Sequence, residues 1–181
     1  LYYRGINVKD IVQADKREHR FGYEETAYLL LFGELPTARQ LVDWKQHIGE
    51  YRKLSDGFKE NAIMKNPPKD IMNALARAVL FAYAFDPEGT PDDLSLEKCL
   101  EQSMDLIGSI PTIAAYAYQA KAHYHDGGSL MIRNPDPAKS TAETLLMLMR
   151  EDGRYTKLEA ETLDLSLIIH AEHGGGNNSS F

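Results

Sequence analysis

The chain has 181 residues, of which 43% are hydrophobic and 26% are charged, which is typical of a folded globular protein. Its formal net charge of −7 argues against a surface that binds nucleic acid or an anionic membrane. The single cysteine, Cys99, cannot form an internal disulfide, which indicates a reducing compartment and predicts a cytoplasmic protein. The longest apolar runs, such as residues 28–32, are too short to span a bilayer, so no transmembrane helix is expected.

The first third of the chain predicts a turn followed by two helices. Arg4-Gly5 is typical of a tight turn, set in a short apolar and then charged loop. Residues 23–32 predict a helix that is apolar on every side in its second half and therefore buried, and Gly33 is a natural stop. Thr37, with Gln40 three residues later, forms a capping box for an amphipathic helix that runs to about residue 54.

The middle of the chain predicts two more helices, both with wide apolar faces. A polar connector with one helical turn leads to Asn66, which is expected to cap a helix over residues 68–85. Ser95 is expected to cap a long helix over residues 95–124, with a kink where Pro111 removes a hydrogen-bond donor. Helices this apolar are either central or lie at a subunit interface.

The last third predicts a short buried helix and one further full helix. Ser140 and Glu143 form a second capping box at the start of the short helix. Residues 157–170 carry apolar residues on most faces, which favours a buried helix. No apolar–polar alternation of useful length occurs, so the sequence predicts one all-α domain over residues 1–181 with about seven helices.

The segment after residue 163 concentrates groups that can hold a ligand. His170 and His173 lie three residues apart with Glu172 between them. The run Gly174, Gly175 and Gly176 then lets the backbone approach a ligand closely. Asn177 begins a series of helix-capping residues, so a new helix is expected there. A histidine beside such a helix start can bind a carboxylate or a phosphate.

Three interpretations of this segment compete on chemistry alone. His173, with the glycines and Asn177, can bind an anionic substrate, and this interpretation is favoured for His173. His170, Glu172 and His173 can instead bind a metal in a helical hydrolase, although the sequence offers no second ligand motif. His170 can also be a purely structural residue, which is favoured for His170 by itself. A non-catalytic helical interaction module remains a further alternative.

The same segment, His170-Ala-Glu-His173-Gly-Gly-Gly-Asn177, resembles the H-[AS]-[DE]-H-x-x-x-N segment of citrate synthases. Four other segments resemble the family in the same order along the chain. They are Tyr3-Arg4-Gly5-Ile6, the run from Ala27 to Thr37 (AYLLLFGELPT), Ser103 to Ile107 with Pro111 and Ala114-Ala115, and Ser140-Thr-Ala-Glu143 with Leu146-Met147. The resemblance therefore covers the whole chain.

The resemblance implies the helical large domain of the citrate synthase fold, from its N-terminal to its central part. It implies an acyltransferase of the tricarboxylic acid cycle that condenses acetyl-CoA with oxaloacetate and water to citrate and CoA. The alternative within the family is 2-methylcitrate synthase, which uses propionyl-CoA. Neither needs a metal or redox cofactor.

For the site, the resemblance implies that His173 and Asn177 bind oxaloacetate, with supporting roles for His170, Glu172, Gly174, Gly175 and Gly176. Glu172 replaces the family's aspartate and Gly174 its usual glutamate, so the supporting residues depart from the family pattern. The main catalytic histidines and aspartate, and the small domain that closes over CoA, would lie beyond Phe181. The chain alone is therefore expected to be inactive. A homodimer is expected through helices around residues 68–85, 95–124 and 157–170.

Overall fold

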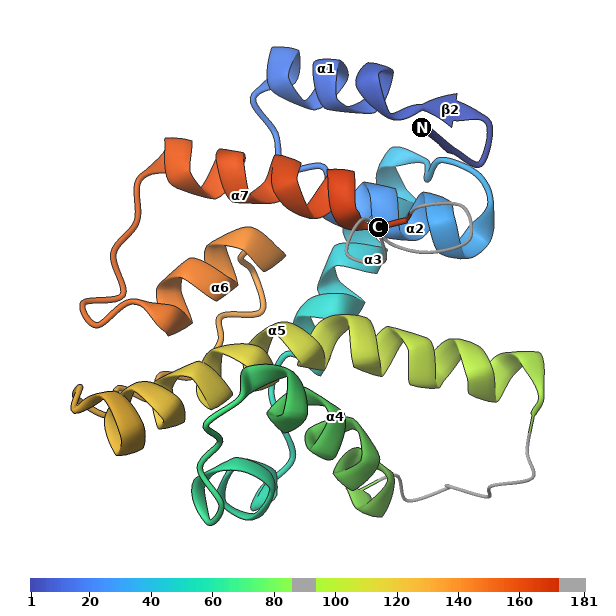
Figure 1. The fold of residues 1–181 in the computed structure, drawn as a ribbon. Coiled ribbons are helices and arrows are strands. Elements are labelled where there is room, and N and C mark those ends of the chain that lie inside the picture. Colours follow the sequence, from blue (N-terminus) through green and yellow to red (C-terminus); the bar gives the residue numbers. More distant parts are fainter. Residues whose placement is uncertain (86–93, 173–181) are drawn as a thin grey trace. The chain divides into compact units, whose positions relative to one another are not determined.

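The computed structural model describes residues 1–85 and 94–172 of the chain (Figure 1). Within these residues the fold is all-α with seven α-helices, as the sequence predicts, and it also has one small hairpin. The hairpin strands are β1 (Tyr2–Tyr3) and β2 (Ile6–Asn7). The helices are α1 (Val8–Glu18), α2 (Tyr23–Phe32), α3 (Ala38–Tyr51), the π-helix η1 (Lys59–Met64), α4 (Ile71–Ala82), the 3-10 helix η2 (Tyr83–Phe85), α5 (Leu96–Asp126), α6 (Thr141–Met149) and α7 (Lys157–His170).

The contacts of the chain group it into two compact units, which are described one at a time. Unit 1 comprises residues 1–46, 140–143 and the chain from residue 155 onward. Unit 2 comprises residues 47–139 and 144–154. The expectation of a single domain over residues 1–181 stays a prediction.

Unit 1 begins with the predicted tight turn. β1 and β2 pair antiparallel, and Arg4 and Gly5 between them have φ angles of 48° and 85°. Two consecutive positive φ angles give the turn the twist that a two-residue hairpin requires. The Arg4 guanidinium donates from Nε and Nη2 to the carbonyl oxygen of Leu30, at 3.1 and 2.8 Å, and so fastens the hairpin to the end of α2.

The charged loop expected after this turn is in fact a helix. α1 begins at the cap residue Asn7, whose side chain accepts a hydrogen bond from the Lys9 backbone N–H. Val8, Ile11 and Asp15 are buried at helical spacing, while the charged residues occupy the exposed face. The sequence did not predict this helix because one of its three buried positions is an aspartate, which leaves too few apolar residues to show helical spacing.

α7 packs against α1 and α2 within unit 1 (Figure 1). Its buried residues are Ala160, Asp164 and Ile168, which lie four residues apart and so share one face. Ile168 joins Tyr3, Val8, Ile11 and Leu29 in a hydrophobic core. The N-terminal hairpin and the last helix, far apart in sequence, are therefore parts of one core.

Unit 2 is built around α5, which continues through Pro111 from Leu96 to Asp126. α4 lies along it and buries Ala74 and Ala78, and these small side chains allow the two helices to approach closely. The core also contains alanines and larger apolar residues, namely Phe58, Ala62, Ile63, Ile113, Ala115, Tyr116, Ala117, Ala120 and Leu148.

Most of the predicted helix ends are confirmed. Gly33 ends α2 with a φ of 88°, and the two capping boxes, Thr37 with Gln40 and Ser140 with Glu143, are both formed. Ser95 caps α5 by accepting from the Lys98 N–H. One cap was predicted wrongly, because α4 begins at Ile71 and its cap is Asp70 in place of Asn66. Asp70 is extended, and its Oδ1 accepts from the Asn73 N–H at 3.0 Å.

Candidate functional site

α7 carries the chain into the segment that the sequence singles out. Thr156 and Glu159 form a capping box at its start that the sequence reading missed. The helix then runs to His170, as predicted. Its buried face is fixed in the core of unit 1, so the position of its last turn is set by that packing.

Tyr3 holds the end of α7 in place. Its side chain is fully buried, and its hydroxyl donates to the carbonyl oxygens of Ile168 at 2.7 Å and Ile169 at 3.1 Å. The same oxygen accepts from the Glu172 backbone N–H at 3.4 Å. Burial raises the pKa of Tyr3, so the hydroxyl keeps its proton and remains a donor. One hydroxyl therefore contacts two carbonyl oxygens in the last turn of α7, of which that of Ile168 also accepts from the Ala171 N–H, and it contacts the residue just before His173.

Of the predicted site residues, only His170 and Glu172 lie within the described part of the chain. His170 and Glu172 are both exposed at the end of α7. His170 Nδ1 donates to the carbonyl oxygen of Ser166 at 2.8 Å, which fixes the ring against its own helix and leaves Nε2 pointing away from that bond. The other predicted residues, His173, Gly174, Gly175, Gly176 and Asn177, lie outside the described residues.

The metal hypothesis gains no support from the part of the chain that is described. Within residues 1–85 and 94–172, no group of three His, Cys, Asp or Glu side chains could hold a metal ion. Its third proposed ligand, His173, lies outside these residues. His170 Nδ1 is engaged with the Ser166 carbonyl oxygen, and the supporting role of His170 stays a prediction.

Unit 1 also buries three carboxyl groups that sequence reasoning did not find. Asp15, Glu24 and Asp164 are each at most 2% exposed. Asp164 Oδ2 accepts from the Gly22 N–H at 2.7 Å, and Oδ1 accepts from the Tyr23 N–H at 3.4 Å. No side chain of α2 itself caps its first turn. Asp164 on α7 therefore supplies the missing cap.

The space around this cap is very tight. A Cβ atom on Gly22 would lie 1.9 Å from Asp15 Oδ2, so only glycine fits between the two aspartates. Arg20 Nη2 lies 3.0 Å from Asp15 Oδ1 as an ion pair, but the contact lacks hydrogen-bond geometry. Glu24 Oε1 accepts from the Thr141 N–H at 2.6 Å, at the beginning of α6. Asp164 and Glu24 thus bind the N-termini of α2 and α6 in the interior of unit 1, whereas Asp15 pairs with Arg20.

Burial dominates the protonation of these groups. It raises the pKa of Asp164 to about 7, although the hydrogen bond from Gly22 lowers it, and the charges of Glu24 and Asp15 raise it further. Burial likewise raises the pKa of Asp15 to about 6 against the lowering effect of Arg20. Both aspartates therefore titrate near neutral pH.

The helical fold is similar to that of solved citrate synthases. The citrate synthase of Thermoplasma acidophilum, solved as a ternary complex with carboxymethyl coenzyme A and oxaloacetate, matches with a TM-score of 0.77 and 25% identity. That match covers 95% of this chain and 41% of the solved chain.

Sequence comparison leads to the same family. The glyoxysomal citrate synthase of Cucurbita maxima is 30% identical, covering 96% of this chain and 33% of the relative. The 2-methylcitrate synthase 2 of Corynebacterium glutamicum is also 30% identical, covering 96% of this chain and 43% of the relative. Residues 1–181 match the family described as "Citrate synthase, C-terminal domain". The chain belongs to the citrate synthase family, and it spans between a third and a half of the length of these relatives.

Proposed function

We propose that the whole protein is an acyltransferase that condenses acetyl-CoA with oxaloacetate and water to give citrate and CoA. The observation that carries this proposal is the family match over residues 1–181. A structurally similar enzyme was solved with oxaloacetate and a coenzyme A derivative, the two ligand classes that this reaction requires.

Within that enzyme, His173 and Asn177 are proposed to donate hydrogen bonds to oxaloacetate. The support comes from the segment that precedes them: α7 is packed on one face, and its last turn is held by Tyr3. His170 and Glu172 support the site and do not react. The reaction also needs a base for the methyl proton of the thioester and donors for the enol oxygen. These groups are proposed to come from the rest of the protein, so the 181 residues alone are expected to be inactive.

The first experiment measures thiol release from acetyl-CoA and oxaloacetate by the full-length protein and by residues 1–181. Turnover by the full-length protein only is expected, and robust turnover by the shorter chain would overturn the division of residues. The variant His173→Ala should raise the oxaloacetate KM of the full-length enzyme. His123→Ala is the control, since His123 is an exposed histidine in unit 2. Equal oxaloacetate kinetics for the two variants would refute the assignment of His173.

A second candidate activity is 2-methylcitrate synthesis from propionyl-CoA. It is favoured by the relative of that name in Corynebacterium glutamicum, which is 30% identical. The same thiol-release assay with propionyl-CoA in place of acetyl-CoA distinguishes the two, because the preferred thioester has the larger kcat/KM. The absence of a metal or redox cofactor and a cytoplasmic location stay predictions. No helix of the described chain is long and apolar enough to cross a membrane.

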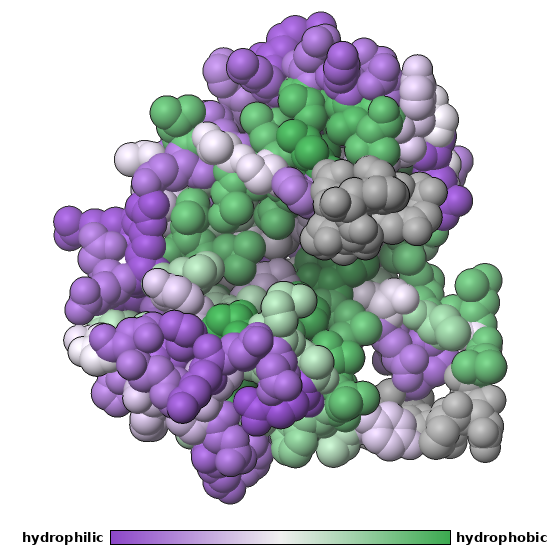
Figure 2. Space-filling model, viewed as in Figure 1, coloured by the Kyte–Doolittle hydropathy of each residue, from purple (hydrophilic) through white to green (hydrophobic). Residues whose placement is uncertain are grey.

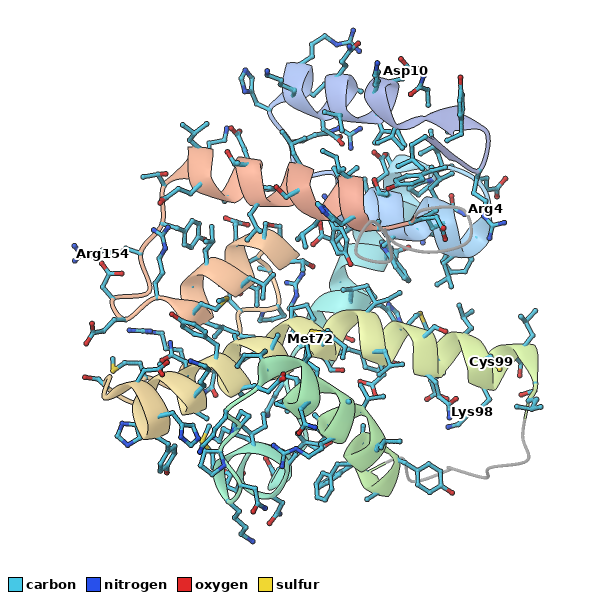
Figure 3. All side chains as sticks on the ribbon, viewed as in Figure 1. Arg4, Asp10, Met72, Lys98, Cys99 and Arg154 are labelled. Carbon is cyan, nitrogen blue, oxygen red and sulfur yellow. The ribbon has the colours of Figure 1, made fainter. Side chains whose placement is uncertain are left out.

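The homodimer is proposed to form through α4, among the three helices that the sequence suggests. The exposed side of α4 is mostly apolar, with Asn73 as a polar member, and Met72 and Leu80 on it are 73% and 79% exposed. Val79 of α4 and Tyr83 of η2 are 37% and 52% exposed. Hydrophobic residues gather over this part of unit 2 in the space-filling view (Figure 2; Met72 is labelled in Figure 3). A helix face of this kind is typical of a protein–protein interface. Light scattering by the full-length protein tests the dimer directly.

A further inference from the structure

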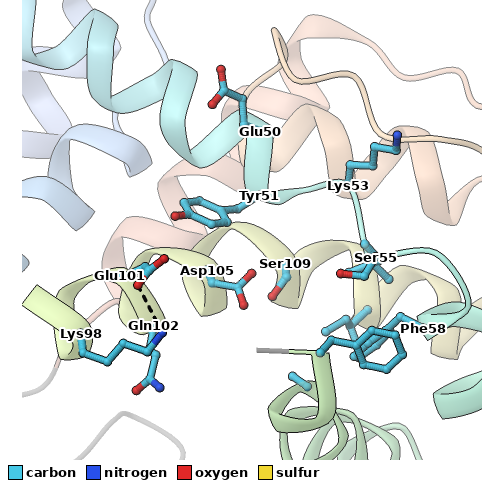
Figure 4. Close-up of a pocket in the computed structure, with 14 residues that line it drawn as sticks. Glu50, Tyr51, Lys53, Ser55, Phe58, Lys98, Glu101, Gln102, Asp105 and Ser109 are labelled. Carbon is cyan, nitrogen blue, oxygen red and sulfur yellow. Dashed lines mark hydrogen bonds and ion pairs between the residues drawn. The ribbon is translucent and has the colours of Figure 1, made fainter. Parts of the chain in front are cut away.

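Unit 2 contains a cavity that the proposed reaction does not use. It has a volume of about 260 Å³ and lies between the end of α3, the chain leading to η1, the end of α4 with η2, and the first half of α5 (Figure 4). The volume is slightly below the ~300–1,000 Å³ of sites for drug-sized ligands, so a ligand of about ten non-hydrogen atoms is the appropriate size. All of the residues that line it belong to unit 2.

The α5 residues that line the cavity change from polar to apolar along the helix. Asp105, Ser109 and Ile113 line it at intervals of four residues, so they stack on one face of α5. This face passes from a carboxylate through a hydroxyl to an apolar side chain. Phe58 and Phe85 lie beside the apolar end, with ring centroids 5.4 Å apart. The cavity therefore has one polar end and one aromatic end.

The side chain of Ser109 gives the cavity wall a hydroxyl group. Ser109 is only 7% exposed and lines the cavity. Across the described chain, no residue forms a hydrogen bond with its side chain, and the same is true of the Tyr51 hydroxyl. A ligand that occupies the cavity would give this hydroxyl a hydrogen-bond partner.

The charges around the polar end favour a cation. Glu50, Glu101 and Asp105 line the cavity against two lysines, Lys53 and Lys98, and Lys98 pairs with Glu101 at 3.3 Å (Figure 4). Burial raises the pKa of Tyr51, and the charges of Glu101, Asp105 and Glu50 raise it further, whereas Lys98 lowers it. The carboxylates thus outweigh the nearest lysine at the Tyr51 hydroxyl.

We propose that this cavity binds a small organic cation, namely a protonated primary amine that carries a compact apolar or aromatic group. The ammonium group lies beside Asp105 and donates to the Ser109 hydroxyl. The apolar group packs on Phe58 and Phe85, where the aromatic faces also attract positive charge. Nothing in this proposal depends on the condensation reaction, so the two can fail separately.

Ligand-observed NMR with the full-length protein tests the charge preference. The probes are 2-phenylethylammonium, the neutral 3-phenyl-1-propanol and the anionic 3-phenylpropionate, which have similar size and differ in charge. Saturation transfer should be strongest for the ammonium probe, weaker for the alcohol and weakest for the carboxylate. Equal or stronger transfer to the carboxylate would overturn the proposal, because the cavity would then favour anions.

Substitutions locate the site. Asp105→Asn should weaken ammonium binding by about tenfold or more, the usual effect of losing one charge-assisted hydrogen bond. Glu97→Gln is the matched control, since Glu97 is exposed on the same helix and does not line the cavity. Ser109→Ala is a second, milder variant that should weaken binding a few-fold. Unchanged affinity in both cavity variants, with native circular dichroism, would place the ammonium probe elsewhere and refute the proposal.

Discussion

Unit 1 should lose stability as pH rises through neutrality, and Asp164 should be the main cause. Its carboxyl is 1% exposed and caps α2 through the Gly22 N–H. Its pKa is raised by burial to about 7, above the ordinary value of 3.8 that the unfolded chain has. A raised pKa means that folding favours the protonated form. The stabilisation is therefore complete below the ordinary pKa and is lost as pH rises through about 7.

The size of the effect follows from the two pKa values. One pKa unit corresponds to about 1.4 kcal/mol, so the full difference between 3.8 and about 7 amounts to roughly 4 kcal/mol. Most of this falls between about pH 5 and about pH 8, where the free energy of unfolding should drop by roughly 2.5 kcal/mol. Asp15, with its pKa raised to about 6, adds a loss of the same sign over a slightly lower range. The two contributions are linked, because the charge of Asp15 raises the pKa of Asp164.

Urea denaturation at several pH values, followed by tryptophan fluorescence, measures this loss. Trp44 is the single tryptophan of the chain and is buried in unit 1, so its emission reports on that unit. Asp164→Asn should remove most of the slope between about pH 5 and about pH 8, because the amide does not ionise. Asp10→Asn, an exposed aspartate on α1, should keep it (Figure 3). Equal slopes in the wild type and Asp164→Asn would refute the reasoning.

Three further substitutions test other parts of the structure. Tyr3→Phe removes the hydroxyl that donates to the carbonyl oxygens of Ile168 and Ile169, so the free energy of unfolding should fall by about 1–2 kcal/mol. The oxaloacetate KM of the full-length enzyme should rise more than kcat changes, and an unchanged KM would exclude a role in positioning His173. Gly108→Ala places a Cβ 2.5 Å from Tyr51 Cβ and 2.8 Å from the Ile48 carbonyl oxygen. The free energy of unfolding, measured by thermal melting, should fall by about 1–3 kcal/mol, and an unaltered Tm would mean that α3 can move to accommodate the methyl group. Leu80→Asp should shift the full-length protein from dimer to monomer in light scattering, and a dimer that persists would exclude α4 from the interface.

Most of the secondary structure could be predicted from local signals in the sequence. The bounds of α2 and α7, the stop at Gly33 and the capping boxes at Thr37 and Ser140 all depend on residues within four positions of one another. Such signals are visible in sequence because capping and helical spacing are local effects. α1 was missed because a buried aspartate, Asp15, occupies one of its core positions, so its apolar residues alone do not show helical spacing.

The buried carboxyl groups could not be predicted in this way. Asp164 finds its partner Gly22 142 residues earlier, and Glu24 reaches Thr141 across 117 residues. In sequence, Asp164 interrupts an apolar helix face and looks like an exposed residue. Only the fold shows that it caps another helix, and that Gly22 must be glycine because Asp15 lies against it. Local patterns carry no information about such partners.

The same long-range contacts connect the first residues of the chain to the proposed substrate segment. α7 is held at its middle by Asp164 against the start of α2, and at its end by Tyr3 in the N-terminal hairpin. Arg4, beside Tyr3, fastens that hairpin to the end of α2. The last described residue, Glu172, is itself held by its backbone N–H at the Tyr3 hydroxyl, and the proposed ligand His173 follows it in the sequence. If His173 binds oxaloacetate as proposed, the Tyr3-Arg4-Gly5 turn supports that site from a distance, and weakening the turn is expected to alter oxaloacetate binding before it alters the chemical step.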